Sequence, residues 1–321
     1  MRIAFNSESS HNGKFWFLPV MIGLLISCSE KYQSTPFIQD YAEKFELNSE
    51  EPKPELYGVR CDRNNTINVL SEEGLLRPAD KYLVNDQLYR PLSDMKIISI
   101  SLYHDQFVYL TGKAILSNAW AGKFYIEHNM NDCKLFEMGE GFSVLLAAED
   151  KLAFYADSEM IWEKSPENLI PMEMLFDETR KHFLILSENA LYKFDTESLE
   201  LMKIFDGKNF TSMTLTAEKD QIVIGTSDGY FTIDAESFEI SSPLNNLLPC
   251  AEISCIEEIK GKLWFGSSHG IFSLRGDGRY DYYASKRWLV DNNVTEISGG
   301  PDNSVLVLTE KGLSKINFIE M

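Results

Sequence analysis

The sequence predicts an all-β protein: a seven-bladed β-propeller of four-stranded blades, with the ring closed by an N-terminal strand. Two observations carry this prediction. A pattern of strand, small polar corner and second strand recurs at intervals of about 40 residues, which is the length of a four-stranded propeller blade. No long segment with apolar residues at helical spacing interrupts the copies, so a fold that alternates strands and helices is disfavoured.

The clearest copy of the repeat spans residues 261–274, GKLWFGSSHGIFSL. A turn at its start, a strand-forming run, a corner of small residues and a second strand-forming run are together typical of a β-hairpin. Weaker copies keep the same order of features, and the residue that ends each corner marks the period. These corner residues are Gly74, Ala114, Glu159, Ala190, Gly229, Gly270 and Gly312.

Further strand-like segments precede many of the hairpins, as at residues 97–102 and 253–256. We assign each such segment to the first strand of a blade. The last copy lacks an outer strand, and residues 34–58 contain the unassigned apolar material that precedes the first copy. We therefore expect part of residues 34–58 to pair with the last blade and close the ring.

Residues 1–27 are predicted to be a signal peptide. Arg2 and Lys14 give a weakly basic start, and residues 15–26 form an apolar run. The run is too short for a membrane-spanning helix and is typical of the apolar region of a signal.

The signal ends in Leu-Ile-Ser followed by Cys28, which resembles the bacterial lipobox. The resemblance implies cleavage before Cys28, lipid attachment to this residue and membrane attachment through the lipid alone. The expected location is the cell envelope, on the periplasmic or the outer side. An ordinary secretory signal with an unrelated cysteine is the alternative. Residues 28–55 are then a tether with the possible closing strand, and residues 56–321 form the propeller.

Charge argues against nucleic acid as a partner. The chain has 30 Lys and Arg residues against 49 Asp and Glu residues, a formal net charge of −19. Such a surface repels phosphate groups and favours solubility. We expect a monomer.

Four cysteines follow Cys28, and their spacing does not match that of a zinc site. They are Cys61, Cys133, Cys250 and Cys255. Buried thiols are the favoured interpretation, and one or two disulfides are the alternative in an exported protein.

The clearest hairpin resembles the two-component regulator propeller repeat, whose typical members read Gly-x-Leu-Trp-Ile-Gly-Thr-x-x-Gly-Leu. The segment that starts at Gly261 reads GKLWFGSSHGIF, and the likeness extends over roughly residues 210–316. The resemblance implies a propeller similar to the periplasmic sensor parts of hybrid sensor kinases, which bind glycan fragments. With no transmembrane helix or kinase region after the propeller, the resemblance favours the fold more than a signalling role.

Two aromatic segments are candidate ligand-binding surfaces. Tyr283, Arg287 and Trp288 follow the clearest hairpin, and Trp120 lies in a second aromatic cluster. Aromatic rings stack on the apolar faces of sugars, while charged groups hold the hydroxyls. Packing between neighbouring blades is the alternative for both segments.

His269, in the corner of the clearest hairpin, is a further candidate ligand-binding residue. A carbohydrate-active enzyme such as a polysaccharide lyase is the alternative function, and it requires His269 and His104 to converge on one face. Polar turn residues are the simpler interpretation of both histidines.

The chain has no nucleophile elbow, P-loop or dinucleotide-binding motif. The sequence therefore assigns no catalytic residue, metal or cofactor. The predicted function is binding of a protein or glycan ligand by a sensor-like or scaffold module.

Overall fold

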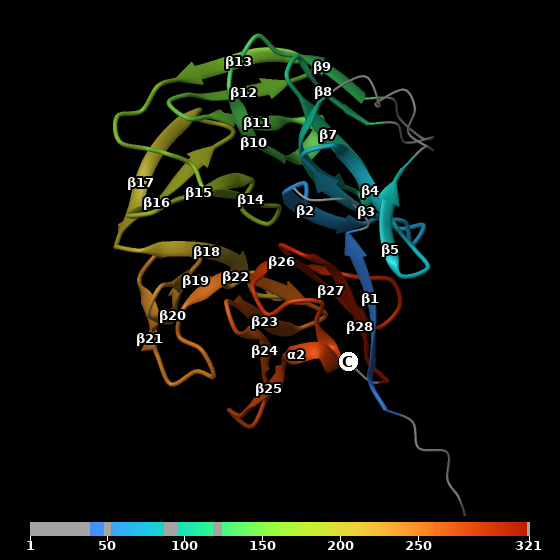
Figure 1. Ribbon diagram of the computed structural model, residues 1–321. Helices are drawn as coiled ribbons and strands as arrows, with labels where there is room; N and C mark the ends of the chain where they lie inside the picture. The colour runs from blue at the N-terminus through green and yellow to red at the C-terminus, as the bar shows by residue number, and fades with distance from the viewer. Residues whose placement is uncertain (1–38, 48–52, 87–95, 118–123, 320–321) are drawn as a thin grey trace, which may run out of the picture. The chain divides into compact units, whose positions relative to one another are not determined.

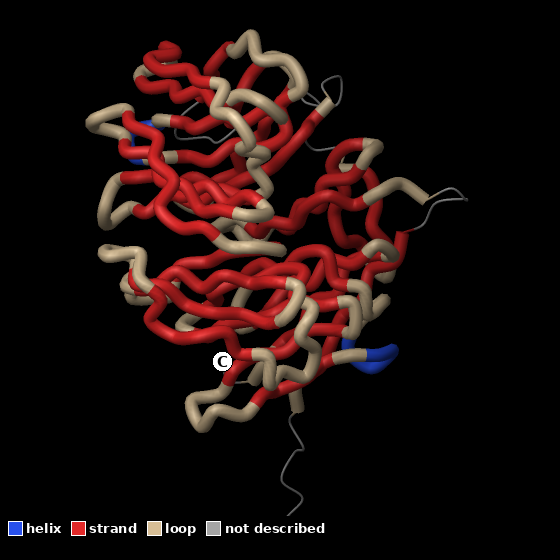
Figure 2. The backbone as a smooth tube through the Cα atoms, turned by 90° about the vertical axis from the view of Figure 1, so that its left-hand side faces the viewer, coloured by secondary structure: helices blue, strands red, loops and turns tan. Residues whose placement is uncertain are grey.

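The computed structural model describes residues 39–47, 53–86, 96–117 and 124–319. The chain divides into two units, Met1–Gln39 and Asp40–Met321. The fold described below is that of the second unit. Within the described ranges no helix is long and apolar enough to span a bilayer. Strands dominate, and in the part of the chain that the structure describes the helical elements are a 3₁₀ turn at Glu140–Phe142 and the short helix α2, Ser285–Trp288 (Figure 2).

Among the described residues, twenty strands form five four-stranded antiparallel sheets (Figure 1). In each sheet the strands follow one another in chain order, as the hairpin repeat predicts. The first sheet has β6 (Ile97–Tyr103), β7 (Gln106–Thr111), β8 (Ala114–Ser117) and β9 (Phe124–Glu127). The second has β10 (Cys133–Met138), β11 (Val144–Ala148), β12 (Leu152–Ala156) and β13 (Glu159–Lys164). The third has β14 (Glu173–Asp177), β15 (His182–Ser187), β16 (Ala190–Asp195) and β17 (Glu200–Asp206). The fourth has β18 (Phe210–Leu215), β19 (Gln221–Thr226), β20 (Gly229–Asp234) and β21 (Ile240–Asn245). The fifth has β22 (Ile253–Ile259), β23 (Lys262–Ser267), β24 (Gly270–Leu274) and β25 (Tyr280–Tyr283).

The other strands belong to one eight-stranded sheet in the order β2-β3-β4-β5-β1-β28-β27-β26. Its N-terminal members are β1 (Tyr41–Leu47), β2 (Leu56–Cys61), β3 (Ile67–Ser71), β4 (Gly74–Ala79) and β5 (Tyr82–Asn85). Its C-terminal members are β26 (Val294–Gly299), β27 (Ser304–Thr309) and β28 (Gly312–Asn317). β1 pairs antiparallel with β28 and, at its last two residues, parallel with β5.

The prediction of seven separate four-stranded blades with an N-terminal closing strand is therefore wrong. Five sheets have the predicted form. Because β1 hydrogen-bonds along both edges, it is an interior strand of the eight-stranded sheet and not the outer strand of a separate seventh blade.

The first strands of the successive units line the middle of the fold. They contact one another in a closed cycle, β2 to β6, β10, β14, β18, β22 and β26, and β26 returns to β2 (Figure 1). The strand-like segments that precede the hairpins, such as residues 97–102 and 253–256, are confirmed as first strands.

The apolar core lies between adjacent sheets. Leu184 and Leu191 of one sheet pack in the same cluster as Ile222 and Ile224 of the next. Trp264 is fully buried in a cluster that includes residues of β26–β28, so this tryptophan packs between neighbouring sheets. Burial of one such large side chain contributes about 1.5–3 kcal/mol.

The corners between second and third strands share a hydrogen bond that explains the small polar residues of the repeat. At six corners a Ser or Thr hydroxyl donates to the carbonyl three residues later, at 2.9–3.0 Å. The pairs are Ser71–Gly74, Thr111–Ala114, Ser187–Ala190, Thr226–Gly229, Ser267–Gly270 and Thr309–Gly312. The residues that recur in the sequence are thus largely those that the hairpin corner requires.

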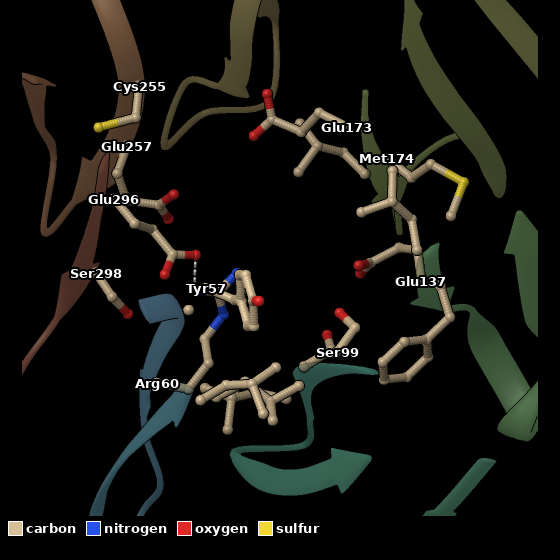
Figure 3. Close-up of a pocket in the computed structure, with 18 of the residues that line it drawn as sticks. Tyr57, Arg60, Ser99, Glu137, Glu173, Met174, Cys255, Glu257, Glu296 and Ser298 are labelled. Atoms are coloured by element: carbon tan, nitrogen blue, oxygen red, sulfur yellow. Dashed lines mark hydrogen bonds and ion pairs between the residues drawn. The ribbon is translucent and has the colours of Figure 1, made fainter. Parts of the chain in front are cut away.

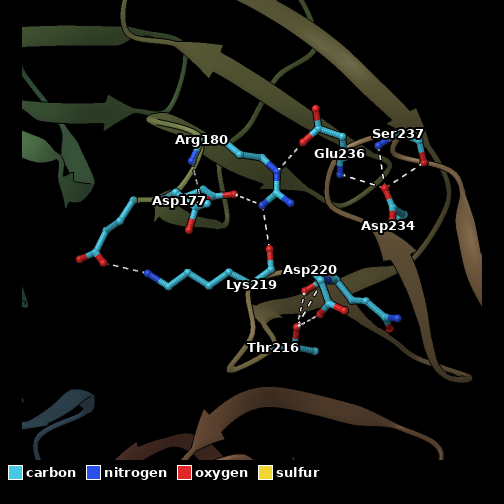
Figure 4. A network of polar contacts seen from close by, with 11 residues as sticks. Asp177, Arg180, Thr216, Lys219, Asp220, Asp234, Glu236 and Ser237 are labelled. Atoms are coloured by element: carbon cyan, nitrogen blue, oxygen red, sulfur yellow. Dashed lines mark hydrogen bonds and ion pairs between the residues drawn. The ribbon is translucent and has the colours of Figure 1, made fainter.

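Polar contacts also join neighbouring sheets at the turns between first and second strands (Figure 4). The Arg180 guanidinium pairs with the buried Asp177 at 2.8 Å, and it donates to the Lys219 carbonyl at 2.7 Å and to Glu236 at 3.0 Å. A buried carboxylate is tolerated only where such donors replace its water, so this contact fixes two sheets relative to each other.

Candidate functional site

The first strands enclose a cavity of about 1350 Å³, which we call the central cavity. Side chains of β2, β6, β10, β14, β18, β22 and β26 line it (Figure 3). Its volume exceeds the roughly 300–1,000 Å³ of most ligand pockets, so it has room for a small ligand together with water.

Alternation along the first strands decides which side chains face the central cavity. Phe136 and Met138 are buried in the core on either side of Glu137, and buried Ile256 precedes Glu257. Because successive side chains of a strand point to opposite faces, the two glutamates face the cavity. The cavity-facing positions are Gly58, Arg60, Ser99, Ser101, Leu135, Glu137, Glu173, Leu175, Ser212, Cys255, Glu257, Glu296 and Ser298.

Glu296 joins β26 to β2 across the cavity wall. One of its carboxylate oxygens accepts a hydrogen bond from the Val59 backbone N–H, and the other pairs with the Arg60 guanidinium. Gly58 leaves room for this contact, because a Cβ at that position would lie 3.5 Å from the Glu296 carboxylate. Glu296 is therefore a structural link as well as a cavity charge.

Glu173 and Ser212 make the same kind of link between other first strands. Glu173 accepts from the Met213 N–H at 2.7 Å, and the Ser212 hydroxyl accepts from the Ile256 N–H at 3.1 Å. In each case a cavity-facing side chain satisfies a backbone donor of the next first strand.

Glu137 and Glu257 differ from these links, since neither carboxyl has a hydrogen bond or ion pair within the described ranges. Burial raises the pKa of each from 4.5 to about 8; the charge of Arg60 opposes the shift, and other cavity carboxylates add to it. Burial also raises the pKa of Glu173, to about 7. Carboxyls with such pKa values can both donate and accept hydrogen bonds at neutral pH, and they occur preferentially at functional sites.

Arg60 is the cation among these carboxyls. Burial opposes its charge, but Glu296, Glu257 and Glu137 raise its pKa, so the guanidinium stays protonated. The other ionisable side chains that line the cavity are Tyr57, Cys61, Lys96, Asp105, Asp132, Cys133, Lys134, Cys255, Glu258 and Lys260. Lys134 pairs with Glu149, and the Lys260 ammonium donates to Asn303.

The four cysteines of the propeller are free thiols. Burial raises the pKa of Cys61 and of Cys133 to about 11 and also raises that of Cys255. These three line the central cavity, where they remain protonated and poorly nucleophilic. Within the described ranges no group of three or more His, Cys, Asp or Glu side chains lies close enough to hold a metal ion.

Four of the predicted ligand-binding residues are described, and none of them lines the central cavity: His269, Tyr283, Arg287 and Trp288. His269 is exposed in the β23–β24 corner, where its Nδ1 lies 2.9 Å from the Ser268 hydroxyl and 3.6 Å from the Cys250 Sγ. Its backbone N–H donates to the Ser267 hydroxyl, which is part of the hairpin pattern.

Tyr283 and Trp288 lie together, with ring centroids 5.1 Å apart, and Tyr283 also packs on Trp264 and Phe318. The Arg287 guanidinium lies 4.8 Å from the Trp288 ring centroid. These contacts account for the two rings as packing residues, and their role in ligand binding stays a prediction. Trp120 and Cys28 lie outside the described residues.

The two histidines of the alternative function do not converge. His104 lies in the turn between a first and a second strand, whereas His269 lies between a second and a third. These turns are at opposite ends of the second strand, so the two imidazoles lie on opposite faces of the propeller. The pairing that a lyase would need is absent for these two residues.

One feature of the sequence indicates the cavity, although it is not part of the hairpin repeat. Glu137, Glu257 and Glu296 each interrupt a short apolar strand next to a buried residue. A charged residue at that place is costly unless it faces a polar space. These glutamates indicate one shared cavity only once the topology shows that the first strands lie side by side.

No protein-family model matches the chain, and no curated protein matches it in sequence. Solved structures match in fold. A streptogramin B lyase structure is 14% identical, covers 89% of this chain and 100% of its own, and has a TM-score of 0.70. The extracellular domain of the putative hybrid two component system BT4673 from B. thetaiotaomicron is 13% identical over 87% of this chain, with a TM-score of 0.67. That of BT3049 is 14% identical over 82%, with a TM-score of 0.63. This chain spans 39% and 40% of these two domains. The similarity shows an all-β propeller fold, consistent with the two-component regulator propellers.

Proposed function

We propose that the protein is a ligand-binding, sensor-like propeller module that holds a small ligand in the central cavity. The observation that carries the proposal is the pair of unlinked carboxyls, Glu137 and Glu257, on the wall of this cavity. Packing of the core does not need them there, because core contacts are made by the alternate side chains of the same strands. A site that retains desolvated ionisable groups is typical of binding or catalysis.

The neighbouring structures are consistent with a sensor-like role. Two of them are described as extracellular domains of putative two-component systems. By analogy with these domains we propose a location in the cell envelope, and from the lipobox-like sequence that ends at Cys28 we propose attachment by a lipid on this residue. A glycan or a protein segment that reaches into the cavity is the kind of partner that fits such a location.

Filling the central cavity tests the proposal. Ser99 is a small residue on its wall (Figure 3), and Ser99→Trp would place a bulky ring there. We expect ligands found by thermal-shift screening of the full chain with sugars, amino acids, amines and short peptides to lose binding in this variant. Ser242→Trp, on the exposed outer strand β21, is the matched control and should keep binding. A ligand that binds both variants equally would contradict a site in the cavity.

Lipid attachment is tested separately. Labelled palmitate should enter the full chain in a bacterial host, and Cys28→Ser should abolish the label. Labelling that persists in the variant would contradict attachment at this residue.

A further inference from the structure

The chemistry of the central cavity selects among ligands. Its cavity-facing guanidinium and carboxyl groups are those of Arg60 and of Glu137, Glu173, Glu257 and Glu296. Arg60 is already paired with Glu296, and Glu173 accepts a backbone hydrogen bond. Glu137 and Glu257 have no hydrogen bond or ion pair in the described part of the chain, although the charge of Arg60 acts on both and lowers their pKa.

These two carboxyls come from different first strands, β10 and β22, and both point into the open space of the cavity (Figure 3). Both side chains are half-buried, so they are partly withdrawn from bulk water, and this burial raises their pKa. A desolvated carboxyl without a partner is unfavourable by itself, so a ligand that supplies positive charge and N–H donors gains more here than at the protein surface.

An inorganic cation does not fit this arrangement. A metal ion needs several ligand atoms around one centre, and hard cations such as Ca²⁺ take six to eight oxygen atoms. Within the described ranges no three potential metal ligands are grouped. An organic cation makes no such demand, because its charges and N–H donors are distributed along its length.

We propose that the ligand of the central cavity is a small organic cation with at least two protonated amine groups, held between Glu137 and Glu257. This inference rests on the proposed function and specifies the chemical class of its ligand. Because Glu296 neutralises the charge of the Arg60 guanidinium, Arg60 does not prevent a second cation from binding in the cavity. Lys96, Lys134 and Lys260 also line the cavity; Lys134 and Lys260 have polar partners of their own.

Proton release accompanies binding of this kind. At pH 7 the two carboxyls are largely protonated, because their pKa values are about 8. An ammonium group beside each carboxyl lowers its pKa, so each gives up its proton to the buffer when the amine binds. Up to about two protons are released per ligand at pH 7, and the number falls towards zero as the pH rises past 9. Affinity for the amine increases over the same range, from pH 6 to pH 9.

The experiment is isothermal titration of the full chain with 1,4-diaminobutane, in buffers of different ionisation enthalpy, at pH 7 and pH 9. Uncharged 1,4-butanediol is the ligand control. We expect binding of the diamine with proton release at pH 7 and little release at pH 9. Glu137→Gln and Glu257→Gln should each weaken binding about 10- to 100-fold and remove about one released proton. Glu200→Gln, an exposed carboxylate on β17, should change neither quantity.

The possible outcomes separate this inference from the proposed function. Diamine binding that is unchanged by both Gln variants, or that releases no protons at pH 7, overturns the inference. If diamines do not bind while an uncharged ligand binds the wild type and not Ser99→Trp, the organic cation is wrong and the proposed function stands. If no compound of the screen binds in a way that Ser99→Trp abolishes, both are overturned. Circular dichroism of each variant shows that a lost signal is not lost folding.

Discussion

Removal of one cavity carboxyl should stabilise the protein at alkaline pH and leave it unchanged at acidic pH. Burial raises the pKa of Glu137 from 4.5 to about 8. Since a tenfold change in proton affinity corresponds to about 1.4 kcal/mol, ionising Glu137 in the folded state costs up to about 5 kcal/mol more than in the unfolded chain. Water in the cavity screens part of this cost, and we expect about 2 kcal/mol to be recovered by Glu137→Gln.

The sign follows from proton linkage. Between about pH 4.5 and pH 8 the folded protein keeps the proton of Glu137 and the unfolded chain releases it, so stability falls as the pH rises through this range. A glutamine cannot ionise and removes this slope. At pH 8.5 the melting temperature of Glu137→Gln should exceed that of the wild type by about 4–8 °C, whereas at pH 4.5 the two should agree.

Thermal unfolding followed by circular dichroism at pH 4.5, 6, 7 and 8.5 measures this difference. Glu200→Gln makes the same change on an exposed strand and should leave the difference near zero at every pH. A melting temperature of Glu137→Gln that follows the wild type in parallel across the series would refute the claim that the carboxyl is desolvated.

Three further changes follow from other contacts. Glu296→Ala leaves the Arg60 guanidinium half-buried without its partner and should cost about 3 kcal/mol of unfolding free energy, measured by urea denaturation. Gly270 has φ +129°, and an added Cβ would lie 2.6 Å from a carbonyl oxygen of the outer strand; Gly270→Ala should therefore cost about 1–3 kcal/mol, while Gly276→Ala, with no atom within 4 Å, should be nearly neutral. Iodoacetamide at pH 8 should alkylate Cys250 faster than the three cavity cysteines, because burial raises the pKa of those thiols.

A specific outcome would contradict each of these three predictions. If Glu296→Ala is as stable as the wild type, the link between β26 and β2 contributes nothing to the free energy of unfolding. Equal stability of the two alanine variants would contradict the strain at the corner. Equal alkylation of all four thiols by mass spectrometry would contradict the burial of the cavity cysteines.

Much of the fold could be predicted because hairpin geometry is local. Ser267 and Gly270 are three residues apart, and the hydrogen bond between them shapes the corner; the same pair of residue types recurs wherever the corner recurs. The pairing of β1 with both β28 and β5 depends on contacts more than 200 residues apart for one edge, and the repeat carries no information on whether two ends merge into one sheet. That part of the architecture was predicted incorrectly.

The candidate site could not be predicted in the same way, because it is made from the positions at which the copies differ. The cavity-facing place after the first-strand bulge is Gly58 in β2, Ser99 in β6, Ser212 in β18 and Glu296 in β26. Packing requires the core residues to be similar from copy to copy, so the core positions can be recognised from the repeat. The cavity lacks this constraint, and the residue at this place changes between glycine, serine and glutamate from strand to strand. A search for conserved features of the repeat therefore finds the hairpin corner, with His269, and passes over Glu137 and Glu257. In a propeller of diverged copies, residues that bind a unique ligand are expected among the unrepeated positions of the first strands, since a repeated residue would surround the axis with identical groups.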